Sequence, residues 1–548
     1  MRNTTLGLKI GAMASVCAIL LSGCGSGEQA KTSDGRPIVT VQVIKDARTK
    51  KMADMEWAKD LEAACDCSIN WEEVASSSWD QQKKAALAAE EVADVTIGGY
   101  GAGDMPEYGS LFMDLKPELS TMPNLSKMFK EEPHSQVIST TADGKILGTP
   151  TVGRSITARS SNHLFVNKAW LDKLGLEIPT TWDEFEQVLI AFKNDDPNGN
   201  GQADEIPFDF NAPGTGGWGL FNPNVLLTGF GIPVGSNGQG LYVENGEVKS
   251  YLNDDRYKDF IEFMNKLWKD GVISSEAFTH DWSKYTSTAK GEGTTAKVGV
   301  TVMWTPSDIF GSDLADQYVT IPALKRTSDQ REKPVWFYNG DDLAYRGFSA
   351  VVSNKVANKE AALKLVDAMY SPDLSVQMRY GSFGTSVKRN VENDYTVLEA
   401  PEGTQPSDWQ FQESLSDGAP GWIGDDMKLA LPDYYTEYRT VDAVYDDDFA
   451  NLDFNNDVLY ANMPMTVDQS RTMNENSTGI TQNAMSQFAK WVTKGGVDKE
   501  WDAYVQSLEK NKLDENIKIE QEVYDSFKKT MKQSGDDLDA LLNPSNKQ

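Results

Sequence analysis

Residues 38–44, Ile-Val-Thr-Val-Gln-Val-Ile, carry an apolar side chain at every second position. Such alternation is typical of a β-strand with one buried face. Helices and strands alternate in the segments that follow: helices are predicted over 52–64 and 79–91, and strands over 69–74 and 93–97. This order favours an α/β fold, in which ligands bind at the carboxyl ends of the strands. We therefore expect Gly98-Gly99-Tyr100-Gly101, after the third strand, at that edge of a sheet.

A helix start is encoded by Thr181-Trp182-Asp183-Glu184. Thr181 can cap the first turn while Glu184 reaches back to it, which makes a capping box. The apolar residues that follow recur at helical spacing and predict one buried face: Trp182, Phe185, Val188, Leu189 and Phe192. Downstream, the patterns predict a buried strand over 298–304 and helices over 360–369 and 501–508.

The ten residues after that helix, Asp-Pro-Asn-Gly-Asn-Gly-Gln-Ala-Asp-Glu at 196–205, are typical of a calcium loop. Calcium takes about six to eight oxygen ligands, often from alternate positions of a tight loop. The expected ligands are the side chains of Asp196, Asn198, Asn200, Asp204 and Glu205 and the carbonyl of Gln202. The loop is not a complete EF-hand, because Pro207 stands where the closing bidentate Glu belongs. A metal-free surface turn rich in Asn and Gly is the alternative.

The N-terminus is typical of an export signal. Arg2 and Lys9 precede an apolar run over 10–21, which is too short to span a membrane. Leu-Ser-Gly-Cys at 21–24 looks like a bacterial lipobox, which predicts removal of 1–23 and lipidation of Cys24. Residues 24–35 are then expected to form a flexible tether. The alternative is an ordinary cleaved signal with an incidental cysteine.

Composition excludes several classes of function. The formal net charge of -30 on 548 residues would repel nucleic acid and anionic lipid headgroups. His134, His163 and His280 are far apart in sequence, which argues against a histidine-based zinc site. Cys65 and Cys67 allow a disulfide, but the short separation would strain it, so we expect free thiols at a helix end. A chain of this length is expected to fold as two lobes.

Several motifs together resemble one family, the extracellular solute-binding lipoproteins of bacterial ABC importers that capture oligosaccharides. They are Asp-Gly-Lys-Ile-Leu-Gly-Thr-Pro at 143–150, Val-Asn-Lys-Ala-Trp-Leu-Asp-Lys-Leu-Gly at 166–175, Pro-Thr-Thr-Trp-Asp-Glu-Phe at 179–185, Val-Gly-Val-Thr-Val-Met-Trp at 298–304 and Gly-Phe-Ser-Ala-Val-Val-Ser at 347–353. Residues 196–207 are similar to the structural calcium loop of the alginate-oligosaccharide branch. The resemblance spans nearly the whole mature chain.

The resemblance implies a large variant of the type II periplasmic-binding-protein fold, with two α/β lobes, a hinge and a ligand cleft between the lobes. We expect lobe one to comprise 36–152 and 318–382. Lobe two is expected to comprise 153–317, with the calcium loop, and 383–548. The crossings between lobes are expected near 150–155, near 307–318 and after about 382.

Sugar capture sets the choice of candidate contacts. Aromatic rings cover the apolar face of a pyranose, and polar side chains bind its hydroxyls. Trp304 is the strongest candidate, since the resemblance implies that the tryptophan ending that strand stacks on sugar. The other candidates at loops or strand ends are Trp79, Tyr100, Trp218, Trp336, Tyr338, Trp422, Arg154 and Asp341. Core packing is the alternative for each aromatic residue, and a solvated loop position for each polar one.

The function implied by the resemblance is reversible binding of an oligosaccharide outside the membrane and its delivery to an ABC permease. We expect a monomeric, non-enzymatic lipoprotein with structural calcium, held at the extracellular face by its lipid alone. A secreted glycosidase or lyase and a surface adhesin are the alternatives, and a peptide ligand also stays open. The acidic run 446–448, with Asp453 and Asp457, is expected to be a solvated face.

Overall fold

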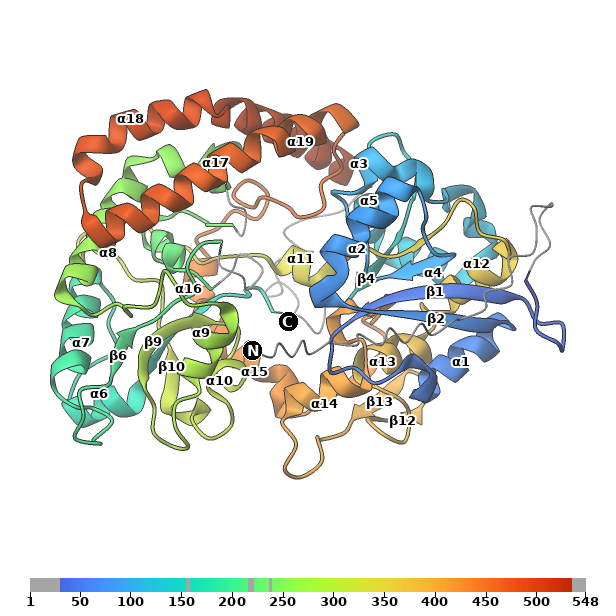
Figure 1. Cartoon of the computed structure of the whole chain (residues 1–548), viewed down its shortest axis with the longest axis horizontal. Coiled ribbons are helices and arrows are strands. Elements are labelled where there is room, and N and C mark those ends of the chain that lie inside the picture. The colour runs from blue at the N-terminus through green and yellow to red at the C-terminus, as the bar shows by residue number, and fades with distance from the viewer. Residues whose placement is uncertain (1–29, 154–157, 215–220, 236–238, 535–548) are drawn as a thin grey trace, which may run out of the picture.

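The computed structural model describes residues 30–153, 158–214, 221–235 and 239–534. The predicted signal peptide and Cys24 lie outside these ranges. Two halves, each built around its own sheet, lie side by side (Figure 1). We call them lobe one and lobe two.

Lobe one is built on a six-stranded sheet. In spatial order its strands are β14 (Gly421–Trp422), β4 (Thr149–Val152), β11 (Tyr345–Val352), β3 (Val95–Ile97), β1 (Ile38–Lys45) and β2 (Ser68–Ala75). β1 runs parallel to both of its neighbours, and Val39, Val41 and Val43 are fully buried. The strand predicted from alternation is therefore confirmed.

Helices cover both faces of this sheet (Figure 1). The helices of lobe one are α1 (Glu56–Cys65), α2 (Ser76–Ala89), α3 (Met105–Tyr108), α4 (Pro123–Glu131), α5 (Pro133–Ile138), α12 (Lys359–Ala368), α13 (Pro372–Tyr380) and α14 (Pro406–Glu413). The predicted helix over 52–64 is divided at Met55, whose extended backbone separates a short 3-10 turn from α1.

Lobe two is built on a four-stranded sheet, ordered β10 (Tyr318–Thr320), β5 (His163–Asn167), β9 (Val298–Met303) and β6 (Ile206–Phe208). Its other elements are α6 (Lys168–Leu174), α7 (Trp182–Asn194), the hairpin β7 (Leu241–Glu244) and β8 (Glu247–Ser250), α8 (Asp255–Asp270), α9 (Trp282–Ala289), α10 (Pro306–Phe310), α15 (Glu437–Ala443) and α16 (Asp446–Phe449). The predicted capping box of α7 is present. The apolar face of α7 packs inward, where Trp182 stacks on Phe263 with ring centroids 4.4 Å apart.

Three C-terminal helices lie across the top of the molecule in Figure 1: α17 (Val467–Lys494), α18 (Val497–Lys510) and α19 (Leu513–Ser534). α17 packs along α8 of lobe two. α19 packs against β8 of lobe two and also against α5 of lobe one, where Met531 Sδ lies 3.3 Å from His134 Nδ1. The last helix thus contacts both lobes.

Sheet membership moves two of the expected crossings between lobes. β10 pairs with β5, so 318–320 belong to the second sheet, and the chain returns to lobe one only at α11 (Gly340–Ala344) and β11. β14 pairs with β4, so the last crossing falls between 422 and 437, about 40 residues or more beyond the expected position near 382. The intervening residues form a small sheet of β12 (Val387–Val391), β13 (Asp394–Val397) and β15 (Lys428–Ala430), packed on α13. Strands this short carry little periodicity, which is why the sequence did not locate them.

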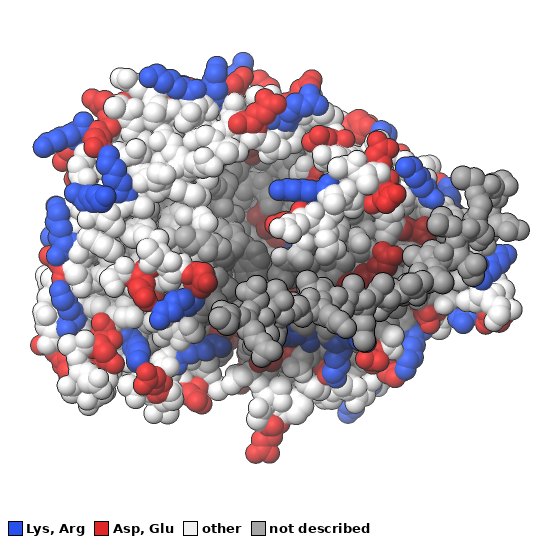
Figure 2. Space-filling model, viewed as in Figure 1, with Lys and Arg blue, Asp and Glu red and all other residues white. Residues whose placement is uncertain are grey.

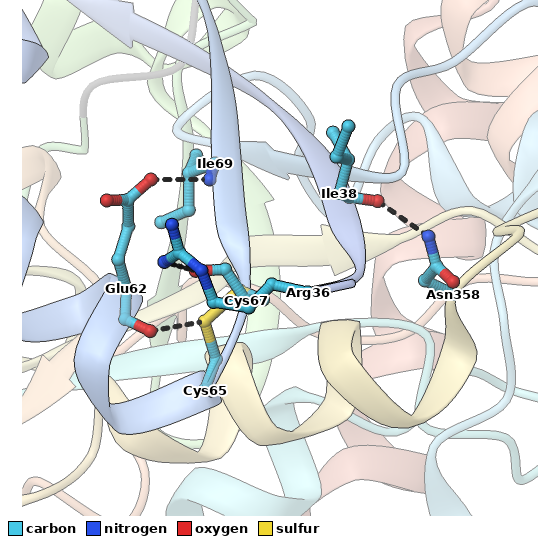
Figure 3. Close-up of a disulfide and its surroundings, with 7 residues drawn as sticks. All are labelled: Arg36, Ile38, Glu62, Cys65, Cys67, Ile69 and Asn358. Carbon is cyan, nitrogen blue, oxygen red and sulfur yellow. Dashed lines mark hydrogen bonds between the residues drawn. A yellow bond between two sulfur atoms is a disulfide. The ribbon is translucent and has the colours of Figure 1, made fainter. Parts of the chain in front are cut away.

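Cys65 and Cys67 form a disulfide (Figure 3). Our expectation of free thiols is therefore wrong. Asp66 between them is left-handed, with φ 52° and ψ 42°, and this turn brings the two Cα atoms to 5.2 Å, within the ordinary range for a disulfide. Both cysteines are buried where α1 leads into β2.

The start of the described chain is fastened beside this disulfide. Asn358 Nδ2 donates to the carbonyl oxygens of Ala30 (2.9 Å) and Ile38 (2.8 Å). Arg36 Nη1 donates to Cys67 O at 3.3 Å (Figure 3). Ala30, which belongs to the predicted tether, therefore contacts lobe one. None of the helices within the described ranges is both long and apolar enough to span a bilayer.

Candidate functional site

Several strand ends of lobe two meet at one edge of its sheet. β6 and β9 are parallel, so their carboxyl ends meet at one edge, and antiparallel β5 begins at the same edge. Trp304 directly follows β9 and is half-buried. Its ring centroid lies 6.4 Å from that of Tyr438 on α15. The space-filling surface is hollowed between the two lobes (Figure 2).

The last crossing segment brings aromatic and acidic side chains to this edge. Tyr434 Oη donates to Asp308 Oδ1 at 3.1 Å. Tyr435 packs edge-to-face on Tyr380 of lobe one, with centroids 5.4 Å apart. Residues 434 and 435 therefore contact different lobes. Directly after them, Glu437 Oε1 accepts hydrogen bonds from the backbone N–H and hydroxyl of Ser307.

We call the place where Trp304, residues 434–438 and Arg379 of lobe one meet the junction. Three polar atoms at the junction are buried without a hydrogen-bond partner among the described residues. They are Glu437 Oε2, Tyr438 Oη and Arg379 Nε. Buried polar atoms are nearly always hydrogen-bonded in folded proteins, so a group of three without partners needs an explanation. Together they offer an acceptor, a hydroxyl and a donor, which a ligand rich in hydroxyl groups would satisfy.

Acidic groups dominate the electrostatics of the junction. Burial raises the pKa of Asp308 to about 6 and also raises the pKa of Glu437. Arg379 of lobe one is paired with Asp417, at 2.8 Å, and Arg346 Nη1 donates to the Asp417 carbonyl oxygen. Both arginines are thus already held by Asp417. The described part of the junction therefore favours a neutral ligand over an anionic one.

Trp79 and Tyr100, predicted as sugar contacts, are packed inside lobe one. Their rings meet edge-to-face with centroids 5.5 Å apart, and Trp79 Nε1 donates to Gly99 O. Tyr100 also packs on Phe112. Each retains about 6% of its surface exposed, so neither offers a free ring face.

Trp336 is 1% exposed and stacks on Tyr445, with centroids 3.8 Å apart, while its Nε1 donates to Asn162 O. This placement gives Trp336 a packing role in lobe two. Tyr338 lies edge-on to Phe449 and Phe454.

Trp422 ends β14 and is largely buried, with Lys127 Nζ 5.1 Å above its ring. Asp341 lies at the start of α11, where its Oδ2 accepts from Ala461 N at 2.7 Å. Arg154 and Trp218, the other two predicted contacts, lie outside the described residues. Of the predicted sugar contacts that are described, Trp304 is the one at the junction.

Four residues that join Trp304 there were not predicted from the sequence: Arg379, Tyr434, Glu437 and Tyr438. A signal existed in the run Asp-Tyr-Tyr-Thr-Glu-Tyr at 433–438, which interleaves aromatic and acidic residues. The run lies in a stretch without periodicity, so the sequence alone did not bring it next to Trp304.

The loop at 196–205 is closed by its own hydrogen bonds. Asp196 carboxylate oxygens accept from the N–H groups of Gly199 and Gly201, at 3.0 and 3.1 Å. Asp204 Oδ1 accepts from the side-chain amides of Asn198 (3.1 Å) and Asn200 (3.0 Å). Gly201, with φ 75°, permits the bend. Within the described ranges, no group of three or more His, Cys, Asp or Glu side chains converges as a metal site would.

One atom of this loop nonetheless lacks a partner. Glu205 Oε1 is buried with no hydrogen bond among the described residues. Burial raises the pKa of Glu205, and the nearby carboxylates of Asp196 and Asp204 add to the rise. A cation would neutralise this concentration of negative charge, so the donor set fits calcium in its chemistry.

The acidic run 446–448 is divided between other contacts. Asp446 pairs with Arg159 at 2.6 Å, and Asp448 Oδ2 accepts from Ala323 N. Asp453 and Asp457 accept backbone N–H groups of their own turn. These carboxylates serve local structure.

Comparisons with known proteins agree with this geometry. Residues 49–374 match the family model described as bacterial extracellular solute-binding protein. Over 426 residues, 74% of either chain, the sequence is 33% identical to the fructooligosaccharide ABC transporter substrate-binding protein FusA of Streptococcus pneumoniae.

Solved structures extend the comparison to most of the chain. An extracellular solute-binding protein from Bifidobacterium longum subsp. infantis has a TM-score of 0.84 at 39% identity, covering 91% of this chain and 100% of that one. An HMO-binding ABC-transporter-associated solute-binding protein of Bifidobacterium longum infantis has a TM-score of 0.84 at 38% identity, with coverages of 90% and 99%. A FusA EF-hand mutant in complex with fructo-nystose has a TM-score of 0.79 at 25% identity, with coverages of 90% and 100%.

Proposed function

The chain belongs to the bacterial extracellular solute-binding protein family, and on that premise we propose that it captures a neutral oligosaccharide outside the membrane and delivers it to an ABC permease. The observation that carries this proposal is the junction around Trp304, where a half-buried indole adjoins three unpartnered polar atoms. An aromatic face beside hydrogen-bonding groups matches the two surfaces of a sugar ring. FusA and the HMO-binding protein, both similar over most of their length, are by name sugar-binding proteins.

Binding would use groups from both lobes. Trp304 and Glu437 lie on lobe two and Arg379 lies on lobe one, so a ligand that contacts all three favours the closed arrangement. A ligand shifts such an equilibrium only by its difference in affinity for the two states. Hinge closure about the crossing segments is thus the expected response to sugar.

The alternatives have less support. A glycosidase needs two carboxylates flanking the scissile bond. Asp308 and Glu437 are acidic residues of the junction, and both are hydrogen-bonded to residues of the protein. The relatives are by name substrate-binding proteins. We accordingly propose a monomeric, non-enzymatic binder, anchored at the extracellular face through lipid on Cys24.

A thermal-shift screen tests the proposed ligand class. The chain from residue 25 onward, without lipid, is expected to melt higher with a neutral oligosaccharide and unchanged with an oligomer of uronic acid. A ligand at a hundred times its Kd adds about 2.7 kcal/mol to the free energy of unfolding, so the shift should be plain. The sugar should be recovered uncut after incubation. A shift with uronate oligomers alone, or cleavage of the sugar, would contradict the proposal.

We also propose that the loop at 196–205 holds structural calcium. The side-chain oxygens of Asp196, Asn198, Asn200, Asp204 and Glu205 and the carbonyl of Gln202 would be its ligands. The unpartnered Glu205 Oε1 and the EF-hand named for FusA support this proposal. Calcium would neutralise the clustered charge and tie the end of α7 to the start of β6.

Removal of calcium is therefore expected to lower the melting temperature. A ligand at a thousand times its Kd adds about 4.1 kcal/mol to the free energy of unfolding, so chelation with EDTA should lower that free energy by an amount of this order. Asp204→Ala should abolish the calcium response and leave sugar affinity within about twofold. Asp195→Ala is the matched control, because this exposed neighbour is not among the ligands. If EDTA leaves the melting of the wild-type chain unchanged, the loop does not bind calcium.

A further inference from the structure

His163 opens β5 directly beside Trp304, and its side chain has no exposed surface. Its Nδ1 lies 2.6 Å from the carbonyl oxygen of Trp304, and its Nε2 lies 3.0 Å from Oδ1 of Asp442. The imidazole therefore bridges the backbone at the end of β9 and a carboxylate on α15. A buried histidine held on both sides in this way has one fixed ring orientation.

The direction of the first hydrogen bond follows from its acceptor. A carbonyl oxygen cannot donate, so the Nδ1–H of His163 donates to Trp304. Asp442 holds the opposite edge of the ring and is itself fixed by Arg159, whose backbone N–H donates to Oδ2 at 2.7 Å. The ring of Tyr445 lies nearly parallel to the imidazole, with the two ring centroids 5.8 Å apart.

α15 also contacts the side chain of Trp304. α15 carries Tyr438, whose ring faces the indole, and Glu437, which binds Ser307 just beyond the indole. Asp442 of the same helix contacts His163, which in turn is hydrogen-bonded to the Trp304 backbone. Because α15 enters lobe two directly from the last crossing, one element of the hinge positions both the ring and the backbone of Trp304.

We propose that His163 is a positioning residue for sugar binding. Its Nδ1–H fixes the backbone of Trp304 and so holds the indole beside Tyr438, while Asp442 keeps the imidazole in that orientation. The inference rests on the proposed function, because it gives His163 an effect on affinity only through the stacking of sugar on Trp304.

Two isosteric variants separate the two ring nitrogens. His163→Asn places an amide nitrogen near the position of Nδ1 and retains the donor to Trp304, whereas His163→Gln reaches towards Nε2 and loses it. Both leave a gap and lower the melting temperature, so stability alone does not decide. His163→Gln is expected to weaken sugar affinity about tenfold, the loss typical of a buried hydrogen bond, and His163→Asn by less than about threefold. Equal losses in the two variants would overturn the assignment.

A double-mutant cycle tests whether the effect passes through the indole. In a Trp304→Ala background, His163→Gln should lower the melting temperature as before and leave the already weakened Kd unchanged. Such non-additivity is the mark of two residues that act as one unit. The same fold-loss in both backgrounds would show that His163 acts on the fold in general, and would overturn the proposal.

A chain that binds no oligosaccharide would refute the proposed function and still leave His163 open to test. The emission of Trp304, taken as the difference between each protein and its Trp304→Phe counterpart, reports the surroundings of the indole directly. We expect His163→Gln to shift this difference spectrum and His163→Asn to preserve it. An unshifted spectrum in His163→Gln would overturn the positioning role without reference to any sugar.

Discussion

Trp304→Ala is expected to weaken the binding of a neutral oligosaccharide by roughly thirtyfold or more. Removal of a central aromatic anchor typically costs about 2 kcal/mol or more of binding free energy, which corresponds to that factor in Kd. The indole is half-buried at the end of β9, so its loss opens little space in the core. The melting temperature of the free protein should therefore change by only a few degrees. Isothermal titration with the best sugar of the thermal-shift screen measures the affinity.

Trp336 supplies the matched control. This tryptophan is buried against Tyr445, so Trp336→Ala should remove about 3–5 kcal/mol of stability. Sugar affinity should be retained in the fraction that stays folded. Trp304→Phe keeps an aromatic face and is expected to recover most of the affinity. Unchanged binding in Trp304→Ala would place the sugar elsewhere and remove the central residue of the proposed site.

Asp341→Asn is expected to stabilise the protein at pH 8 and to change little at pH 4. Burial raises the pKa of Asp341 from 3.8 to about 7, so the folded state holds a proton that the unfolded state releases. The stability that depends on this proton is complete below about pH 4 and is lost as the pH rises to 7. Above pH 7 the ionised carboxylate destabilises the folded state by about 4 kcal/mol. Asparagine cannot ionise, and its carbonyl oxygen can still accept from Ala461 N.

Melting curves between pH 4 and pH 8, at constant free calcium, measure this effect. The wild-type melting temperature should fall across the range, and the curve of Asp341→Asn should be flatter. The melting temperature of Asp341→Asn will still fall somewhat as the pH rises, because burial also raises the pKa of Asp209 and of Glu520 to about 7. Asp342→Asn is the control, since this neighbouring carboxylate is exposed. A lower melting temperature for Asp341→Asn at pH 8 would show that the charged form is the one the hinge requires.

The sequence was most informative where periodicity and local chemistry act over a few residues. Alternation at 38–44 identified β1, and the Thr181–Glu184 pair identified the start of α7, because both signals depend only on neighbouring side chains. The positions of the lobe boundaries were hard to predict for the opposite reason, because they depend on contacts between distant residues. β10 and β14 contain three and two residues, and only their pairing with β5 and β4 shows the sheet to which each belongs.

The candidate site divides in the same way. Trp304 could be proposed from the sequence because the resemblance implies that the tryptophan ending this strand stacks on sugar. Tyr438 and Arg379 reach the junction only through contacts between residues far apart in the sequence, which no local pattern reveals. The disulfide was missed for a further reason. Its formation depends on the left-handed backbone of Asp66, and aspartate adopts that conformation readily enough that no glycine marks the turn.

The attachment of the chain start to β1 has a mechanical consequence for a lipid-anchored protein. A pull on residue 30 enters lobe one at the first residue of β1 and runs along the strand. β1 is paired in parallel with β2 over eight residues and with β3 over three. A force along the strand loads these hydrogen bonds together, in shear, whereas a force across it would break them one at a time. The hydrogen bond from Asn358 to Ile38 and the turn closed by the Cys65–Cys67 disulfide stabilise the start of β1, where this force acts. With the proposed lipid anchor, lobe one would thus resist extension, while the hinge, which follows strands at the opposite edge of the sheet, would remain free to move.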